Sequence, residues 1–154
     1  MKNSNSQSRE SGQGLVILII ILLIIGGGFW YLFSNKKTMD REARAFGREM
    51  IEALTVKHDV NFFVNHLSPQ MKLDYPPTQQ QFVISQFQQL GLPQQPIKID
   101  ETITFESQFF SPRGHFTGHL FYPTQAATLD IDVSHPVGKW QLDNMTFSTG
   151  QGGP

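Results

Sequence analysis

Two histidines and two aspartates are the side chains of this sequence whose types and spacing could do chemistry. His115 and His119 have the His-x3-His spacing that binds zinc on a helix, but they lie in a stretch that alternates like a β-strand. At a rise of ~3.3 Å per residue their rings would lie ~13 Å apart, unless Gly118 forms a bulge. No cysteine and no nearby carboxylate completes a metal site. We therefore predict no metal ligand.

The two aspartates alternate with apolar residues. Leu129, Ile131 and Val133 fall on one side of the expected strand, and Asp130 and Asp132 fall on the other. In an antiparallel sheet with one packed face, that alternation is typical of carboxylates that face solvent. We expect both carboxylates to point away from the core and to take no part in a buried site.

The strand that carries the histidines has apolar residues on both of its faces. The two sets that compete for the interior are Phe116, Leu120 and Tyr122 on one face and Phe121 on the other. If the first set faces inward, both histidines are exposed and no general base remains on this strand. The sequence thus assigns no catalytic residue, no cofactor-binding residue and no cofactor, and we expect the chain not to be an enzyme.

Helices are expected to come first in the domain that holds these strands. One apolar stripe at helical spacing consists of Ala43, Phe46, Met50, Ile51 and Leu54. The pairs Asp40–Arg44 and Arg48–Glu52 have the spacing of helical ion pairs.

Two shorter helices and a linker follow in the expected order. Asp59 can cap the second helix, whose Val60, Phe63, Val64 and Leu67 face inward, and Ser68-Pro69 ends it. A linker through Tyr75-Pro76-Pro77 leads to the third helix. That helix begins with a capping box of Thr78 and Gln81 and stops at Gly91.

After Pro96 the period changes from helical to alternating. The expected strands are 97–110, as one long or two short strands, then 115–122, 126–134 and 139–147, with turns at 111–114, 122–124 and 135–138. Short turns between consecutive strands make an antiparallel meander. The predicted fold class is α+β, with two or three helices packed on a curved, cone-like antiparallel sheet of about four strands.

An uncharged stretch from Leu15 to Phe33 precedes this domain. A helix of that length spans roughly 29 Å, close to the ~30 Å hydrocarbon core of a bilayer. A cleaved secretory signal is the alternative, because the three glycines 26–28 suit a peptidase. The apolar run continues beyond them, and Trp30 and Tyr31 suit a membrane interface. We favour an uncleaved signal-anchor, a transmembrane helix that stays.

The chain therefore divides into five predicted segments. These are a disordered polar tail (1–14), a transmembrane helix (15–33), a linker (34–37), a soluble α+β domain (38–149) and a disordered tail (150–154). Basic residues precede the span at Lys2 and Arg9 and follow it at Lys36, Lys37, Arg41 and Arg44. A plain count of these charges would hold the C-terminal side in the cytoplasm.

Composition limits the partners of the domain. From Thr38 onward eight Lys and Arg stand against twelve Asp and Glu, which argues against nucleic acid as a partner. The sequence has no cysteine, so it has neither a disulfide nor a lipidation site. In each of the pairs Phe62-Phe63 and Phe109-Phe110, the two adjacent rings cannot both point inward on a regular helix or strand. One ring of each pair is therefore expected on a surface open to a partner.

The stretch HLFYPTQAATLDIDVSHPVGKWQLDNMTF is similar to the last strands of nuclear transport factor 2-like (cystatin-like cone) domains. In these domains a Gly-x-Trp, here Gly138 and Trp140, tightens and packs the final hairpin. The resemblance covers roughly Thr38 to Phe147. A second resemblance is to the cytochrome oxidase assembly factor 1 family, in which a membrane helix also precedes a small α+β domain. The first resemblance implies a single-pass protein of the cell inner membrane with its domain in the periplasm.

Two functions stay open, because the cone fold hosts several activities. The preferred one is a non-enzymatic, membrane-anchored domain for protein interaction or envelope assembly, with a protein partner or as a homodimer through the sheet. The alternative is a small-molecule binding protein or an enzyme that uses the cavity between helices and sheet. A filled apolar interior favours the first; an open pocket with convergent His, Asp or Tyr favours the second.

Overall fold

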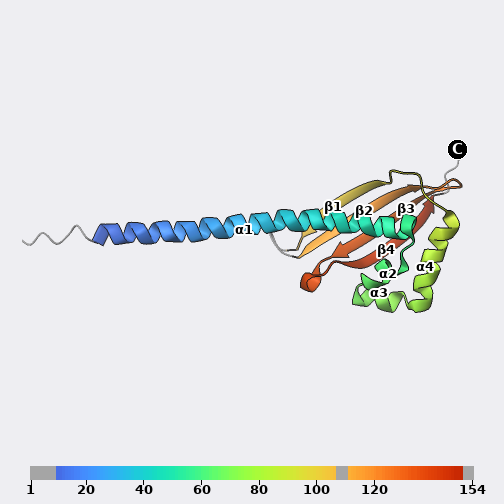
Figure 1. Cartoon of the computed structure of the whole chain (residues 1–154), viewed down its shortest axis with the longest axis horizontal. Coiled ribbons are helices and arrows are strands. Elements are labelled where there is room, and N and C mark those ends of the chain that lie inside the picture. Colours follow the sequence, from blue (N-terminus) through green and yellow to red (C-terminus); the bar gives the residue numbers. More distant parts are fainter. Residues whose placement is uncertain (1–9, 107–110, 151–154) are drawn as a thin grey trace, which may run out of the picture. The chain divides into compact units, whose positions relative to one another are not determined.

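The computed structural model describes residues 10–106 and 111–150. The chain divides into two units, residues 1–37 and 38–154, and each is described by itself. Helix α1, Glu10–Glu52, contributes residues to both units (Figure 1). It begins inside the segment predicted to be a disordered tail and includes the predicted linker 34–37. Of that predicted tail, residues 1–9 lie outside the described part, as do 151–154 at the other end.

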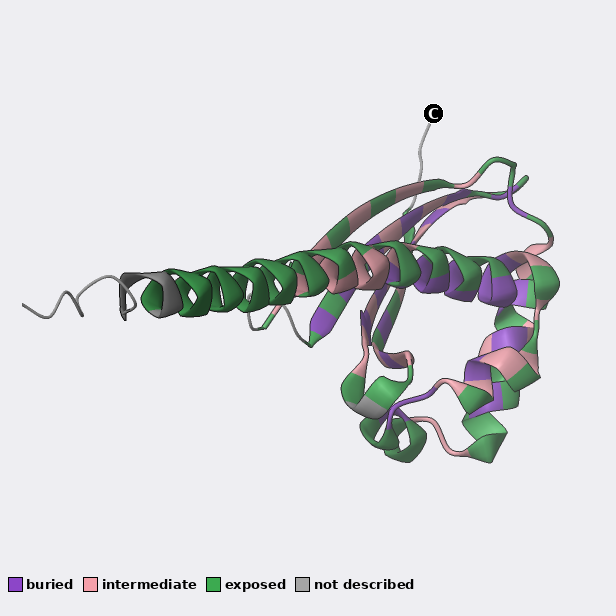
Figure 2. Ribbon diagram, turned by 60° about the vertical axis from the view of Figure 1, so that its left-hand side comes forward, coloured by how far each residue is buried: buried purple, intermediate pink, exposed green. Residues whose placement is uncertain are grey.

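In the first unit the chain is one apolar helix. Its large side chains are exposed almost throughout, for example Leu23 at 70% and Trp30 at 77%, and Figure 2 shows this part of α1 in green. Apolar side chains exposed on all sides of a helix fit a lipid environment better than water. This helix is long and apolar enough to cross a membrane, as predicted.

The second unit contains helices followed by a sheet. The end of α1 passes into a π-helical turn, Ala53–Lys57, and then come α2 (Val60–Asn65), α3 (Pro69–Asp74) and α4 (Pro77–Leu90). The sheet consists of β1 (Lys98–Phe105), β2 (Pro112–Phe121), β3 (Ala126–Ser134) and β4 (Gln141–Gly150). The strands are antiparallel and lie side by side in chain order. The predicted α+β class and its meander are confirmed.

Two helix starts differ from the prediction. Ser68 does not only end α2: its hydroxyl accepts a hydrogen bond from the Met71 amide (3.2 Å) and caps α3, a helix that lies where a linker was expected. The predicted capping box of Thr78 and Gln81 is wrong, because α4 already begins at Pro77. A proline fits the first helical position, where no backbone donor is needed.

The predicted turn 111–114 is also wrong. Strand β2 begins at Pro112, and Pro112 pairs with Phe105 of β1. Residues 107–110, including the Phe109-Phe110 pair, lie outside the described part. The other two turns lie where expected. Gly138 ends the short 3-10 turn Pro136–Gly138 at φ 78°, a conformation that favours glycine.

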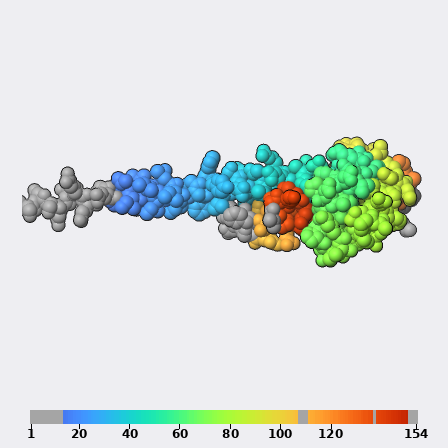
Figure 3. Space-filling view, turned by 60° about the horizontal axis from the view of Figure 1, so that its bottom comes forward, coloured from blue at the N-terminus to red at the C-terminus, as the bar shows by residue number. Residues whose placement is uncertain are grey.

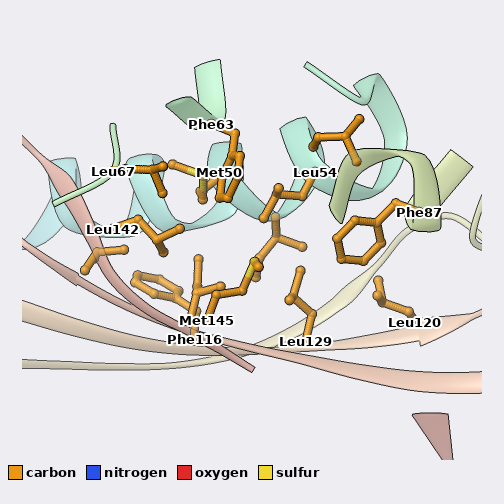
Figure 4. Packing of buried hydrophobic residues seen from close by; sticks show 14 of the residues in the cluster. Met50, Leu54, Phe63, Leu67, Phe87, Phe116, Leu120, Leu129, Leu142 and Met145 are labelled. Carbon is orange, nitrogen blue, oxygen red and sulfur yellow. The ribbon is translucent and has the colours of Figure 1, made fainter. Parts of the chain in front are cut away.

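The core lies between the helices and one face of the sheet. In Figure 4 helical residues such as Met50 and Phe63 point toward strand residues such as Phe116 and Leu129, and each of these four is fully buried. The whole predicted stripe of α1 is buried, which confirms it. On β2 the set Phe116, Leu120 and Tyr122 faces inward, while Phe121 is 53% exposed.

Strand β4 is bulged and has a second neighbour at its start. A register shift between Asp132 and Val133 of β3 lets both Leu142 and Met145 face the core. On its other side Leu142 pairs in parallel with Leu67, the residue between α2 and α3. The space-filling view shows the residues around the start of β4, in red, against those of α2 and α3, in green (Figure 3).

Candidate functional site

The interior between helices and sheet is occupied by the domain's own apolar side chains. Its cluster of eighteen buried residues takes contributions from all four helices and from β2, β3 and β4. The phenol of Tyr122 is buried in this region, and burial raises its pKa to about 12. Among the described residues its hydroxyl has no hydrogen-bond partner. One protonated phenol among apolar groups is not a convergent catalytic set.

The predicted candidates His115, His119, Asp130 and Asp132 all lie on the opposite face of the sheet. This arrangement follows from the strand period, because their neighbours on β2 and β3 face the core. His115 is exposed and His119 is partly exposed, and both lie outside the core because Phe116, Leu120 and Tyr122 face inward. Both aspartates are partly exposed and lie outside the core.

His115 forms a cross-strand pair with Asp132. The two residues are direct partners in the β2–β3 register, and His115 Nδ1–H donates to Asp132 Oδ1 at 2.7 Å. The second oxygen of that carboxylate accepts from Asn144 Nδ2 of β4 at 3.1 Å. The result is a hydrogen-bonded line across three strands, a common way to stabilise one face of a sheet.

Together with Thr117, His115 and Asp132 form an Asp–His–Thr arrangement that resembles a catalytic triad with a threonine nucleophile. The Thr117 hydroxyl lies 3.4 Å from His115 Nε2, but it donates its proton to Asp130 Oδ1 at 2.6 Å. The histidine therefore does not take the proton of this hydroxyl. The neighbouring strand amides are committed to the ladder, so no oxyanion donors converge here. The geometry supports sheet pairing rather than acyl transfer.

His119 binds a different carboxylate on a different strand. Its Nε2–H donates to Asp100 Oδ2 of β1 at 2.8 Å, and this hydrogen bond, helped by Lys98, lowers the pKa of Asp100. The two histidines therefore do not share a ligand. Within the described residues no three His, Cys, Asp or Glu side chains gather as a metal site would require.

The sequence did not predict a cluster of three charged side chains that joins α1 to the inward face of β1. Glu101 lies on the inward face of β1 and binds both Arg44 and Arg48 of α1, the latter with Nε to Oε2 at 3.0 Å. Burial alone would raise the pKa of Glu101, but the hydrogen bonds from Arg48 and Arg44 lower it overall. The expected Asp40–Arg44 pair is present, whereas Arg48 binds Glu101 in place of the predicted partner Glu52. The sequence signal that could have predicted this cluster is the position of Glu101. It lies between Ile99 and Ile103 on the same face of the strand, so its carboxylate must face inward and needs a positively charged partner.

An open groove runs between α4 and β4. Its volume is about 410 Å³, and its lining residues are Tyr75, Gln79, Phe82, Val83, Gln86, Phe87, Met145 and Phe147. Within its lining, the rings of Phe87 and Phe147 meet edge to face with centroids 5.0 Å apart. Phe82 is 60% exposed at the groove. The lining combines apolar side chains with the polar groups of Tyr75, Gln79 and Gln86.

The aromatic pair expected to offer a surface residue does so in part. Phe63 is fully buried, while Phe62 is half-buried against Phe46 and His66. Trp140, expected under the closing hairpin, is half-buried and stacks on Phe46 at 5.9 Å. Among the described residues of the second unit, the most exposed aromatic side chain is instead Phe82, which helical spacing alone did not single out.

Comparison with protein-family models, with curated proteins and with solved structures found no match in any of the three.

Proposed function

We propose that this chain is a single-pass, membrane-anchored domain that works by binding other proteins, in assembly of the cell envelope, and not by catalysis. The observation that carries the proposal is the division of the domain into a filled apolar interior and a wet polar face. A cavity enzyme needs ionisable groups that converge in a desolvated pocket. Here the histidines and aspartates are paired with one another in solvent.

The proposed location is the cell inner membrane, with the domain in the periplasm. An exposed apolar helix supports a membrane anchor. The resemblance to nuclear transport factor 2-like domains supports export, since single-pass bacterial proteins with such domains carry them outside the inner membrane. The positive charges that follow the span favour the opposite orientation, so a test of orientation is required.

The proposal is tested by cross-linking the full-length protein in its own membrane. We compare the natural chain with a triple variant, His115→Asn, Asp130→Asn and Asp132→Asn, which removes the ionisable groups around His115 and leaves the His119–Asp100 pair in place. We expect the same cross-linked polypeptide in both, because that face is structural.

Two results would contradict the proposal. One is the absence of any cross-linked polypeptide from the natural chain. The other is a small molecule that co-purifies with the natural chain and is lost from the triple variant, which would favour the small-molecule or enzyme alternative.

A further inference from the structure

The two edges of the sheet are protected differently. Edge strands expose unpaired backbone groups, and natural proteins discourage strand addition there with charges, including charges that point inward. Strand β1 carries Lys98 and Asp100 on one face and Glu101 on its inward face. The edge formed by β1 therefore has the features that prevent pairing with another chain.

Strand β4 lacks this protection over its second half. From Asn144 to Gly150 it contains no charged residue and no proline. Among the described residues, the backbone of this stretch has β3 as its one strand neighbour. The amide of Met145 donates to the side chain of Asn144 at 2.9 Å, a local bond of the kind an unpaired backbone donor makes.

The first half of the same edge already carries an isolated parallel β-bridge, between Leu67 and Leu142. The amide of Ser68 donates to the Leu142 carbonyl at 2.9 Å, and the Leu142 amide donates to the His66 carbonyl at 2.7 Å. Between them Leu67 places its side chain in the core, where it is 4% exposed. The chain itself thus shows how an extended segment pairs with β4 and inserts an apolar side chain inward.

The groove continues this arrangement along the second half of β4. Two inward-facing residues of that half, Met145 and Phe147, form the groove floor together with Phe87, and Phe82 and Val83 of α4 line it. No charged side chain lines the groove. A helix or a small molecule could fill such a groove, but an extended peptide alone would also satisfy the backbone groups of the edge.

We propose that β4 from Asn144 to Gly150 binds an extended segment of another polypeptide as a fifth strand, with alternate apolar side chains of that segment in the groove beside α4. This inference rests on the proposed function and names its binding site. A second copy of the chain fits this site less well, because a β4 that paired here would bring its own α4 to the same face of the extended sheet.

The test uses the full-length protein in detergent micelles and a short synthetic peptide of alternating threonine and valine with a lysine at each end. In a strand, alternate amides point to one edge. Two N-methylated versions, one for each set of amides, therefore separate strand pairing from simple hydrophobic contact. We expect one methylated version to bind about tenfold more weakly than the parent peptide and the other to bind like it.

Two protein variants locate the site. Phe82→Lys places a charge in the groove. Phe121→Lys makes the same change at another exposed phenylalanine, on the outward face of the sheet (53% exposed, against 60% for Phe82). We expect about tenfold weaker peptide binding for Phe82→Lys and unchanged binding for Phe121→Lys.

Three results would overturn the inference: equal binding of both methylated peptides, equal binding by both variants, or dimerisation of the chain that Phe82→Lys abolishes. If the peptides do not bind while cross-linking still identifies a partner polypeptide, the inference is wrong and the proposed function stands. If neither experiment detects a polypeptide, both are wrong.

Discussion

At position 47 the absence of a side chain sets how closely α1 approaches the sheet. A Cβ placed there would overlap the ring of Phe116, which is itself fully buried. Gly114 on β2 leaves room for the same ring from the other side. The ring thus lies between two glycines, and close packing of this kind does not tolerate added volume.

We predict that Gly47→Val lowers the free energy of unfolding by about 2–3 kcal/mol, because the valine must displace Phe116. The matched control is Ala45→Val, the same final residue at an exposed position of the same helix, which should cost about 0.5 kcal/mol. Urea unfolding of both full-length variants in micelles measures the difference. Equal losses would show that α1 is not in close contact with β2.

Residue-level reasoning from sequence succeeded where the period was unambiguous. Strand β3 has the predicted bounds, because Leu129, Ile131 and Val133 alternate with polar residues without exception. The sequence alone did not indicate a role for Gly47 or Glu101, because the role of a glycine in a helix or an acidic residue in a strand depends on the element packed against it. Distances between elements are not encoded in local spacing.

At the scale of elements, the Arg44–Glu101–Arg48 cluster joins α1 to the edge strand β1. Two guanidinium groups share one carboxylate whose side chain is 14% exposed, so the pairing is more shielded than a surface ion pair. The cluster also orients an inward-pointing charge that would otherwise be unpaired. It both docks the helix and protects the edge.

The lowered pKa of Glu101 gives this cluster a pH signature. Because the folded-state pKa lies below the usual 4.5, the stabilisation is complete above that value and is lost as pH falls through the folded-state pKa. We predict that Glu101→Gln costs about 1–2 kcal/mol at neutral pH and loses less stability than the natural chain on acidification.

Thermal unfolding of the full-length protein between neutral and acidic pH measures this effect. Glu42→Gln, at an exposed position on α1, is the control and should retain the acid sensitivity of the natural chain. Parallel pH profiles for Glu101→Gln and the natural chain would show that the cluster contributes no linkage.

Element order and the Asp59 cap of α2 were predictable, whereas α3 and the start of α4 were not. Helix α3 has six residues and a proline at its start, so its sequence shows too few turns for a helical period. The groove was missed for a related reason: Phe82 belongs to α4 by spacing, but its exposure depends on how far β4 lies from that helix.

At the scale of the whole molecule, the two units suit different environments: the exposed apolar helix suits lipid, and the α+β unit with its buried core suits water. The first contains the large side chains expected in lipid, and the second buries a cluster of apolar residues between its helices and its sheet. The proposed binding takes place at the surface of the domain, and the unprotected edge at β4 is the part of that surface best suited to pairing. Which proteins the domain could bind depends on the side of the membrane on which it lies.

In the proposed function, an uncleaved span holds the domain outside the cytoplasm. A reporter enzyme that is active only outside the cytoplasm, fused after Pro154 of the full chain, measures this, with a cytoplasm-specific reporter at the same position as its control. We predict activity from the first reporter alone, in a fusion that keeps its full length and stays in the membrane fraction. Activity from the cytoplasmic reporter alone, or a shortened fusion released from the membrane, would contradict the account.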